Sequence, residues 1–474
     1  MTSIPQQAVS SRLRLPGAGA TRLRPRFDAM RFLLAGLVVM SISKIHANFP
    51  AIAALRPALV FALLCLLYAV ANPKTLDTDR LLKTWPARVM AGLGFWACLS
   101  VPFGLSMGGS AMYLLSEYSK TLILAFLLVA AIRNASDLLA FVWAMVIGTG
   151  CLTYLAVFVF RASATQTGLV RIASGYAYDA NDMCVIGIIG LVMALLVYQV
   201  TSAKGKFICV MVLVSIGMMI ARSGSRGGFL GLVAVGAALF VMVRTVSLDK
   251  KLAVVGLLGL GLFLSAPEGY IQQMETILHP TQDYNYDSKS GRMEIWKRGM
   301  SYMFSHPITG IGIDNFQRAE GTIADIAVVA REEEYTGVRW NAAHNTLVQI
   351  GAELGIPGFM LMSILIYRGI YEMYRIRKRL PKHWIKGDAE ERFLFQASVF
   401  LPVAMVGFGT SGLLVSHAYI EPVYVIAALQ AGFYNVLEKK LRQAGGAAAP
   451  APTVKRVRGG IPAAHPVFVP TVEP

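Results

Sequence analysis

Apolar segments of membrane-spanning length recur along most of the sequence, with one long polar interruption at residues 267–356. A helix needs about 20 predominantly apolar residues to cross a bilayer. With 55% hydrophobic and 15% charged residues, the chain is too apolar for a set of soluble domains. The sequence therefore predicts an all-α, polytopic membrane protein with about 12 transmembrane helices. The predicted spans are residues 30–45, 51–71, 88–104, 117–132, 138–160, 183–201, 206–221, 226–244, 250–266, 357–374, 393–412 and 418–437.

The positive charges predict the orientation of these spans, because lysine and arginine are enriched in cytoplasmic loops. An arrangement with both termini inside places most of the 44 Lys and Arg residues on the cytoplasmic side. This distribution accounts for the net charge of +17, so we expect membrane lipids and no nucleic acid as partners. The expected organisation is a basic cytoplasmic tail (1–29), transmembrane helices 1–9 (30–266), an external loop with short helices (267–356), helices 10–12 (357–440) and a cytoplasmic tail (441–474).

The cysteines carry no sign of a metal or redox centre. All five lie inside apolar segments, without the paired spacing or nearby histidines of a zinc site. Phosphate-binding glycine loops, dinucleotide fingerprints and nucleophile elbows are absent from the sequence. We expect neither a cofactor nor a bound metal.

Two helices are predicted within the external loop. One begins near Arg292, where Ser288 or Ser290 is placed to cap it, and its apolar stripe starts at Trp296 and continues through Gly299, Met300 and Met303. The other is expected over residues 341–354, with His344 on one face. Gly355 and Pro357 should stop that helix, which is too short to span and should lie at the membrane interface.

Arg222 and Arg226 occupy a tight external hairpin between two spans. Their charges lie close to bilayer depth, where an uncompensated charge costs about 2.5 to 3.5 kcal/mol. Two arginines at this spacing, with glycines and serines between them and Arg292 in the adjoining loop, predict a phosphate site. The alternative is that both side chains simply extend toward lipid headgroups.

A second polar cluster lies before the span at 183–201. It contains Arg171, Asp179, Asn181 and Asp182. The carboxylates are suited to pairing with the arginines, to binding sugar hydroxyls or to holding a metal ion. We favour pairing or sugar binding, because no histidine lies nearby in the sequence.

His344 is the candidate base. An imidazole with a pKa near 6.5 suits proton removal from a hydroxyl, and the Asn345 side chain is placed to orient the ring. The alternative is a histidine that only makes structural hydrogen bonds.

These residues resemble motifs of the O-antigen ligase and polymerase superfamily over about residues 170–430. The resemblance is carried by Ser225-Arg226-Gly227-Gly228 at the start of a span, by Gly291-Arg292 with Trp296, and by Ala343-His344-Asn345-Thr346-Leu347 ahead of Gly355-Ile356-Pro357-Gly358. It implies a multispanning glycosyltransferase of the bacterial inner membrane, with its active site facing the periplasm. The donor would be a glycan on undecaprenyl pyrophosphate, and the acceptor a sugar hydroxyl of the lipid A core.

The resemblance also implies roles for individual residues. His344 would take the acceptor proton, while Arg226 and Arg292 would hold the pyrophosphate. Arg222 and Arg171 are added to this anion site from charge placement alone. Transfer would invert the anomeric carbon and would need neither ATP nor a metal ion.

Three alternatives remain open. An O-antigen polymerase or a protein O-oligosaccharyltransferase would use the same donor with a different acceptor, and the motifs do not separate these from a ligase. A transporter of lipid-linked glycans is a more distant alternative. Such proteins usually carry internal repeats, and the sequence shows none.

Overall fold

The structure, a computed structural model, describes residues 27–164, 170–172, 177–243, 247–249, 266–267, 269–279, 291–332 and 340–447, together with residues 23, 252 and 256. Two compact units are present. Residues 1–436 form the first, and the second (437–474) is described only over the last part of one helix, to residue 447. The site lies entirely in the first unit.

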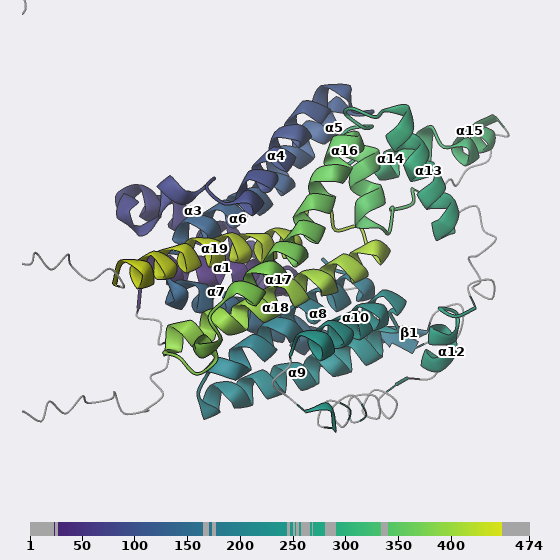
Figure 1. Cartoon of the computed structure of the whole chain (residues 1–474). Coiled ribbons are helices and arrows are strands. Elements are labelled where there is room, and N and C mark those ends of the chain that lie inside the picture. The colour runs from purple at the N-terminus through teal and green to yellow at the C-terminus, as the bar shows by residue number, and fades with distance from the viewer. Residues whose placement is uncertain are drawn as a thin grey trace, which may run out of the picture. The chain divides into compact units, whose positions relative to one another are not determined.

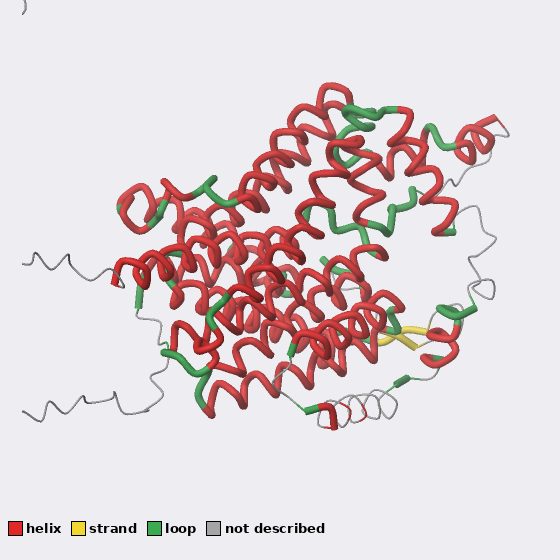
Figure 2. Tube along the Cα trace, in the orientation of Figure 1, coloured by secondary structure: helices red, strands yellow, loops and turns green. Residues whose placement is uncertain are grey.

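Helices make up most of the described chain, and Figure 2 shows loops and one short two-stranded ribbon beside them. The strands are β1 (Ala162–Ala164) and β2 (Val170–Ile172), which pair antiparallel. The helices are α1 (Ala29–Ser43), α2 (Pro50–Ala54), α3 (Pro57–Ala71), α4 (Trp85–Ser100), α5 (Met107–Tyr113), α6 (Ser119–Ala131), α7 (Ala135–Tyr154), α8 (Ala180–Val200), α9 (Ala203–Ser223), α10 (Arg226–Met242), α12 (Tyr270–Glu275), α13 (Arg292–Ser305), α14 (Phe316–Thr322), α15 (Asp325–Glu332), α16 (Thr346–Ser363), α17 (Gly369–Arg379), α18 (Ala389–Ser411) and α19 (Glu421–Ala447).

Among the described residues, 7 helical segments are long and apolar enough to cross a membrane. They are Ala51–Ala71, Met107–Ala131, Ala135–Val159, Ala180–Val200, Ala203–Ser223, Thr346–Arg379 and Ala389–Leu414. The shorter apolar helices α1 and α10 coincide with two more predicted spans. Most of the predicted span at 250–266 lies outside the described residues. The chain is thus an all-α polytopic membrane protein, and the full number of spans stays a prediction.

Helices α8 and α18 form the centre of the first unit. The two helices contact each other, and α8 also packs against α7, α9 and α10 (Figure 1). Small residues allow this close approach. A Cβ atom added at Gly190 of α8 would lie 2.6 Å from the Cβ atom of Thr149 in α7. Because lipid tails are as apolar as the side chains, such packing is a main source of helix association in a membrane.

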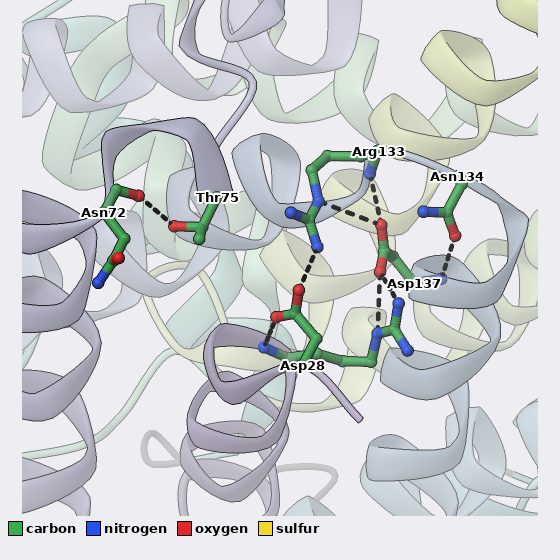
Figure 3. A network of polar contacts seen from close by, with 7 residues as sticks. Asp28, Asn72, Thr75, Arg133, Asn134 and Asp137 are labelled. Carbon is green, nitrogen blue, oxygen red and sulfur yellow. Dashed lines mark hydrogen bonds and ion pairs between the residues drawn. The ribbon is translucent and has the colours of Figure 1, made fainter. Parts of the chain in front are cut away.

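The start of α1 is tied to the start of α7 by a cluster of charged side chains (Figure 3). Asp137 is fully buried and accepts hydrogen bonds from Arg31 Nε at 2.8 Å and from the Arg133 backbone N–H at 3.0 Å. Asp28, which caps α1, pairs with Arg133 at 2.8 Å. Each buried charge therefore has an opposite partner, as a low-dielectric site requires.

A bend at Gly355 divides α16. Its φ of 68° lies in the left-handed region, and the helix resumes directly afterwards. The Ile356 N–H donates to Pro307 O at 2.8 Å, and the indole N–H of Trp96 in α4 donates to Leu354 O at 3.1 Å. These bonds satisfy backbone groups that the break releases. The prediction that the helix ends at Gly355 is therefore confirmed, because the backbone angles of Gly355 are not helical and a second helical part begins directly after it.

The close approach of α7 and α8 predicts different outcomes for two glycines. Gly190→Ala should lower the free energy of unfolding by about 1–3 kcal/mol, because the Thr149 backbone must move away. Gly217→Ala on the neighbouring helix α9 should be neutral or slightly stabilising, since nothing lies within 4 Å of the added methyl group. Thermal unfolding of both variants in detergent measures the difference. Equal midpoints would contradict the packing.

Candidate functional site

Helices α13, α14 and α16 share a small hydrophobic core outside the central bundle (Figure 1). Its buried members are Ile295, Tyr302, Ile311, Phe316, Ala319, Ala343 and Ala352. Helix α13 starts at Arg292 as predicted, but its cap is Gly291, without a side-chain hydrogen bond. The proposed capping residues Ser288 and Ser290 lie outside the described residues.

The buried face of α13 differs slightly from the predicted stripe. Ile295, Gly299 and Tyr302 are buried, whereas Met300 is 43% exposed. Val348 of α16 packs so closely on Gly299 that a Cβ atom there would lie 2.4 Å from it. The predicted stripe was rotated by about one residue, because periodicity alone gives several near-equivalent faces on a short helix.

His344 lies in a turn before α16, held from two sides. The Trp296 indole N–H donates to Ala343 O at 3.0 Å, and the His344 backbone N–H donates to Ser416 Oγ at 2.8 Å. His344 itself has a φ of 46°, in the left-handed region. The prediction that a helix over residues 341–354 includes His344 was therefore wrong. The turn fixes the backbone of His344 independently of α16.

The side chain of Asn345 caps α16, which explains why this helix begins at Thr346. Its side-chain Oδ1 accepts hydrogen bonds from the N–H groups of Leu347 at 3.0 Å and Val348 at 3.1 Å. This is an ordinary N-cap. The side-chain oxygen of Asn345 thus contacts the first turn of α16. A role for Asn345 in orienting the His344 ring or a substrate stays a prediction.

Residues 415–417 run alongside the His344 turn. The Thr346 hydroxyl donates to Val415 O at 2.9 Å and accepts the His417 backbone N–H at 3.2 Å. Just before this segment, Leu414 lies 3.1 Å from the position of a Cβ atom at Gly227, in the first turn of α10. The 415–417 segment, with Leu414 just before it, therefore connects the His344 turn to the N-terminal end of α10, where Arg226 lies.

The start of α8 meets the same segment. Asp179 caps the helix by accepting the N–H groups of Asn181 at 2.7 Å and Asp182 at 2.8 Å, and Asp182 returns a bond to the Asp179 N–H. The second carboxylate oxygen of Asp182 lies 2.8 Å from Nε2 of His417. The polar cluster predicted before this span thus caps α8 and forms a hydrogen bond with His417.

Burial and three charged side chains affect the pKa of His344. Burial lowers the pKa of His344 below its ordinary value, and the positive charge of Arg292 lowers that pKa further. The carboxylates of Asp179 and Asp182 oppose this by raising the same pKa. The structure therefore gathers Arg292, Asp179 and Asp182 near the imidazole, from three separate parts of the sequence.

The other predicted arginines are placed differently. Arg226 Nη1 donates to Thr276 Oγ1 at 2.8 Å, just beyond the end of α12. Arg222 Nη1 donates to Val157 O near the end of the helical segment that follows α7, which gives this guanidinium a structural partner. Arg171 lies on β2, near enough to Cys184 in the first turn of α8 to interact with it electrostatically.

Sequence reasoning missed His417 as part of this cluster. Its only signal was its place at the external end of a predicted span, on the same side as His344. Over the part of the chain that the structure describes, no group of three or more His, Cys, Asp or Glu side chains is arranged to hold a metal ion. The site therefore consists of a base candidate, cations and hydrogen-bonded carboxylates.

The chain matches a known protein family over part of its length. Residues 209–363 match the family model described as O-antigen ligase. This confirms, over that range, the resemblance indicated by the motifs. The matched range contains Arg222, Arg226, Arg292 and His344, whereas Asp182 and His417 lie outside it. No curated protein sequence matches the chain.

The charges around His344 predict opposite pKa changes in two variants. Arg292→Gln should raise the pKa of His344, because a nearby positive charge that disfavours the imidazolium is removed. Asp182→Asn should lower that pKa, because a negative charge that favours the imidazolium is removed. Histidine NMR titration of the labelled protein, with His344→Gln to assign the signal, measures both. Shifts in the same direction would contradict the arrangement.

Proposed function

We propose that this chain, which matches the O-antigen ligase family over residues 209–363, is a glycosyltransferase acting at the periplasmic face of the bacterial inner membrane. It transfers a glycan from undecaprenyl pyrophosphate to a sugar hydroxyl of the lipid A core. The observation that carries this proposal is the placement of His344. The histidine is held by Trp296 and Ser416 beside a fixed cation, Arg292, and its pKa is lowered by burial.

The chemistry follows from a neutral imidazole beside a cation. His344 removes the proton of the acceptor hydroxyl as that oxygen attacks the anomeric carbon. The bond from this carbon to the pyrophosphate oxygen breaks, and the electron pair leaves with undecaprenyl pyrophosphate. Attack from the face opposite the leaving group inverts the anomeric centre. The pyrophosphate linkage supplies the driving force, so the step needs no ATP.

Arg292 has two effects in this scheme. Its charge helps to keep His344 neutral and ready to accept a proton. Its guanidinium also offers paired N–H donors to the pyrophosphate, whose negative charge grows as the bond breaks. Arg226 is the second proposed pyrophosphate ligand, and Arg171 a further one. Arg222 is a weaker candidate, because it donates to Val157 O.

Asp179 and Asp182 complete the electrostatic balance. Once His344 has accepted the proton it is an imidazolium, and the two carboxylates favour that charged state. Arg292 and the carboxylates thus act on opposite sides of the proton transfer. We infer that this pairing places the imidazole pKa in a range where proton removal is efficient.

Other acceptors define the alternative functions. An O-antigen polymerase and a protein O-oligosaccharyltransferase would use the same base and the same anion site, and the match to a family described as O-antigen ligase supports the ligase. A transporter of lipid-linked glycans does not need a histidine held in a fixed turn. The product formed by the purified protein separates these functions.

The first test replaces the proposed base. His344→Ala should lower the transfer rate by about 10²–10⁴-fold, because general base catalysis contributes this much. His383→Ala, in the distant exposed loop before α18, serves as the control. The assay uses purified protein in liposomes, undecaprenyl pyrophosphate glycan, lipid A core and a chelator.

The products decide the function. Glycosylated lipid A core supports the ligase, whereas longer lipid-linked chains would identify a polymerase. Full transfer by His344→Ala would remove this histidine from the mechanism.

The second test concerns the cation. Arg292→Ala should lower the transfer rate by about 10²–10³-fold, as expected for loss of one preorganised donor to a developing negative charge. Arg292→Lys should recover little of this loss, because lysine lacks the planar fork. Lys297→Ala is the matched control, since that side chain is exposed on the same helix and pairs with Glu294, three residues before it. An unchanged rate in Arg292→Ala would exclude the proposed role.

A further inference from the structure

We propose that His417 is a positioning residue for His344, acting through its hydrogen bond to Asp182. This inference rests on the proposed function, in which His344 is the base. It adds a residue that lies outside the range matched by the family model. Hydrogen bonds join three segments here: the start of α8, residues 415–417 and the turn at 343–346.

His417 anchors the 415–417 segment to α8. Its imidazole Nε2 lies 2.8 Å from Asp182 Oδ1, and its side chain is only 1% exposed. Asp182 is itself fixed, because its other oxygen accepts the Asp179 N–H in the capping box of α8. Since α8 is central in the bundle, this contact ties a loop segment to the most rigid part of the unit.

The same segment holds the backbone of the proposed base. Ser416 accepts the His344 N–H at 2.8 Å, and the His417 N–H donates to Thr346 Oγ1 at 3.2 Å. Ser416 and His417 thus hold the chain on both sides of Asn345. Asp182 is therefore linked to His344 by the hydrogen bond to His417, the peptide bond between His417 and Ser416, and the hydrogen bond from Ser416 to His344.

The two histidines have different surroundings. The Nδ1 atom of His417 is buried and, over the described residues, has no hydrogen-bond partner. Its Nε2 is occupied by Asp182. The ring is therefore closed to a substrate hydroxyl, and Nε2–H donation to the carboxylate is the contact it can offer. His344 is less buried and carries no such bond in the described chain, which leaves its imidazole as the candidate for proton transfer.

Three substitutions separate positioning from other roles. Glutamine reaches as far as Nε2 of histidine, so His417→Gln retains a donor to Asp182. Asparagine reaches only as far as Nδ1, the atom without a partner, and alanine removes the donor altogether. His417→Asn and His417→Ala should therefore share a defect that His417→Gln largely lacks. A histidine acting as a base would lose its role in all three variants.

The first readout does not depend on activity. Hydrogen–deuterium exchange of the peptide covering residues 341–348 reports on the bond from the His344 N–H to Ser416. Exchange there should become about 10-fold faster in His417→Ala and His417→Asn and remain near the wild-type rate in His417→Gln. Unchanged exchange in all three variants would overturn the inference. If alanine prevents folding, the comparison of asparagine with glutamine still decides.

The second readout is transfer. His417→Ala should lower kcat by up to about 100-fold with little change in the KM for the donor, because a misplaced base slows the chemical step. Loss of activity in His417→Gln equal to that in His417→Ala would overturn positioning. The two proposals fail separately: normal transfer by His417→Ala, with His344→Ala inactive, would refute only the role of His417. Normal transfer by His344→Ala would refute the proposed mechanism.

Discussion

The hydrogen bonds between residues 344–346 and residues 415–417 are the constraint on which the site depends. They join the end of the long loop to the segment between α18 and α19, and through Asp182 to the start of α8. A second set of contacts comes from the core that α13 and α14 share with α16, to which Ala343 of the turn belongs. A hydrogen bond from the Trp296 indole N–H to Ala343 O also ties α13 to the turn. The two sets of contacts together fix the backbone at His344, a loop residue, to the surrounding helices.

The charges follow from the same assembly. Arg292 begins α13, while Asp179 and Asp182 begin α8, so each charged group is fixed by a helix start. Negative side chains at a helix N-terminus are favoured by the helix dipole and by the free N–H groups. An arginine in that position gains nothing from the dipole.

Close helix packing supports this arrangement. Glycines in α8 and α10 let the central helices approach one another, and Gly227 brings the first turn of α10 against Leu414. A membrane offers little hydrophobic force between helices, so shape determines how they meet. The bend at Gly355 plays a related part, because it places a kink between the helical part that follows the His344 turn and the apolar helical part after it. The Trp96 indole N–H and Pro307 O satisfy the backbone groups that this bend exposes.

The sequence by itself determined the helical class, the approximate position of most apolar helices and the resemblance to the O-antigen ligase family, which is carried by motifs containing Arg226, Arg292 and His344. Apolar length and side-chain type are local properties, and they can be read without knowing the fold. Only the tertiary structure decided that Arg222 bonds to Val157 O and that His417 meets Asp182, a residue 235 positions away. It also decided that His344 lies in a turn ahead of α16, because neighbouring segments supply the bonds that hold this backbone. Such partners are set by how helices pack, and a periodic pattern carries no information about them.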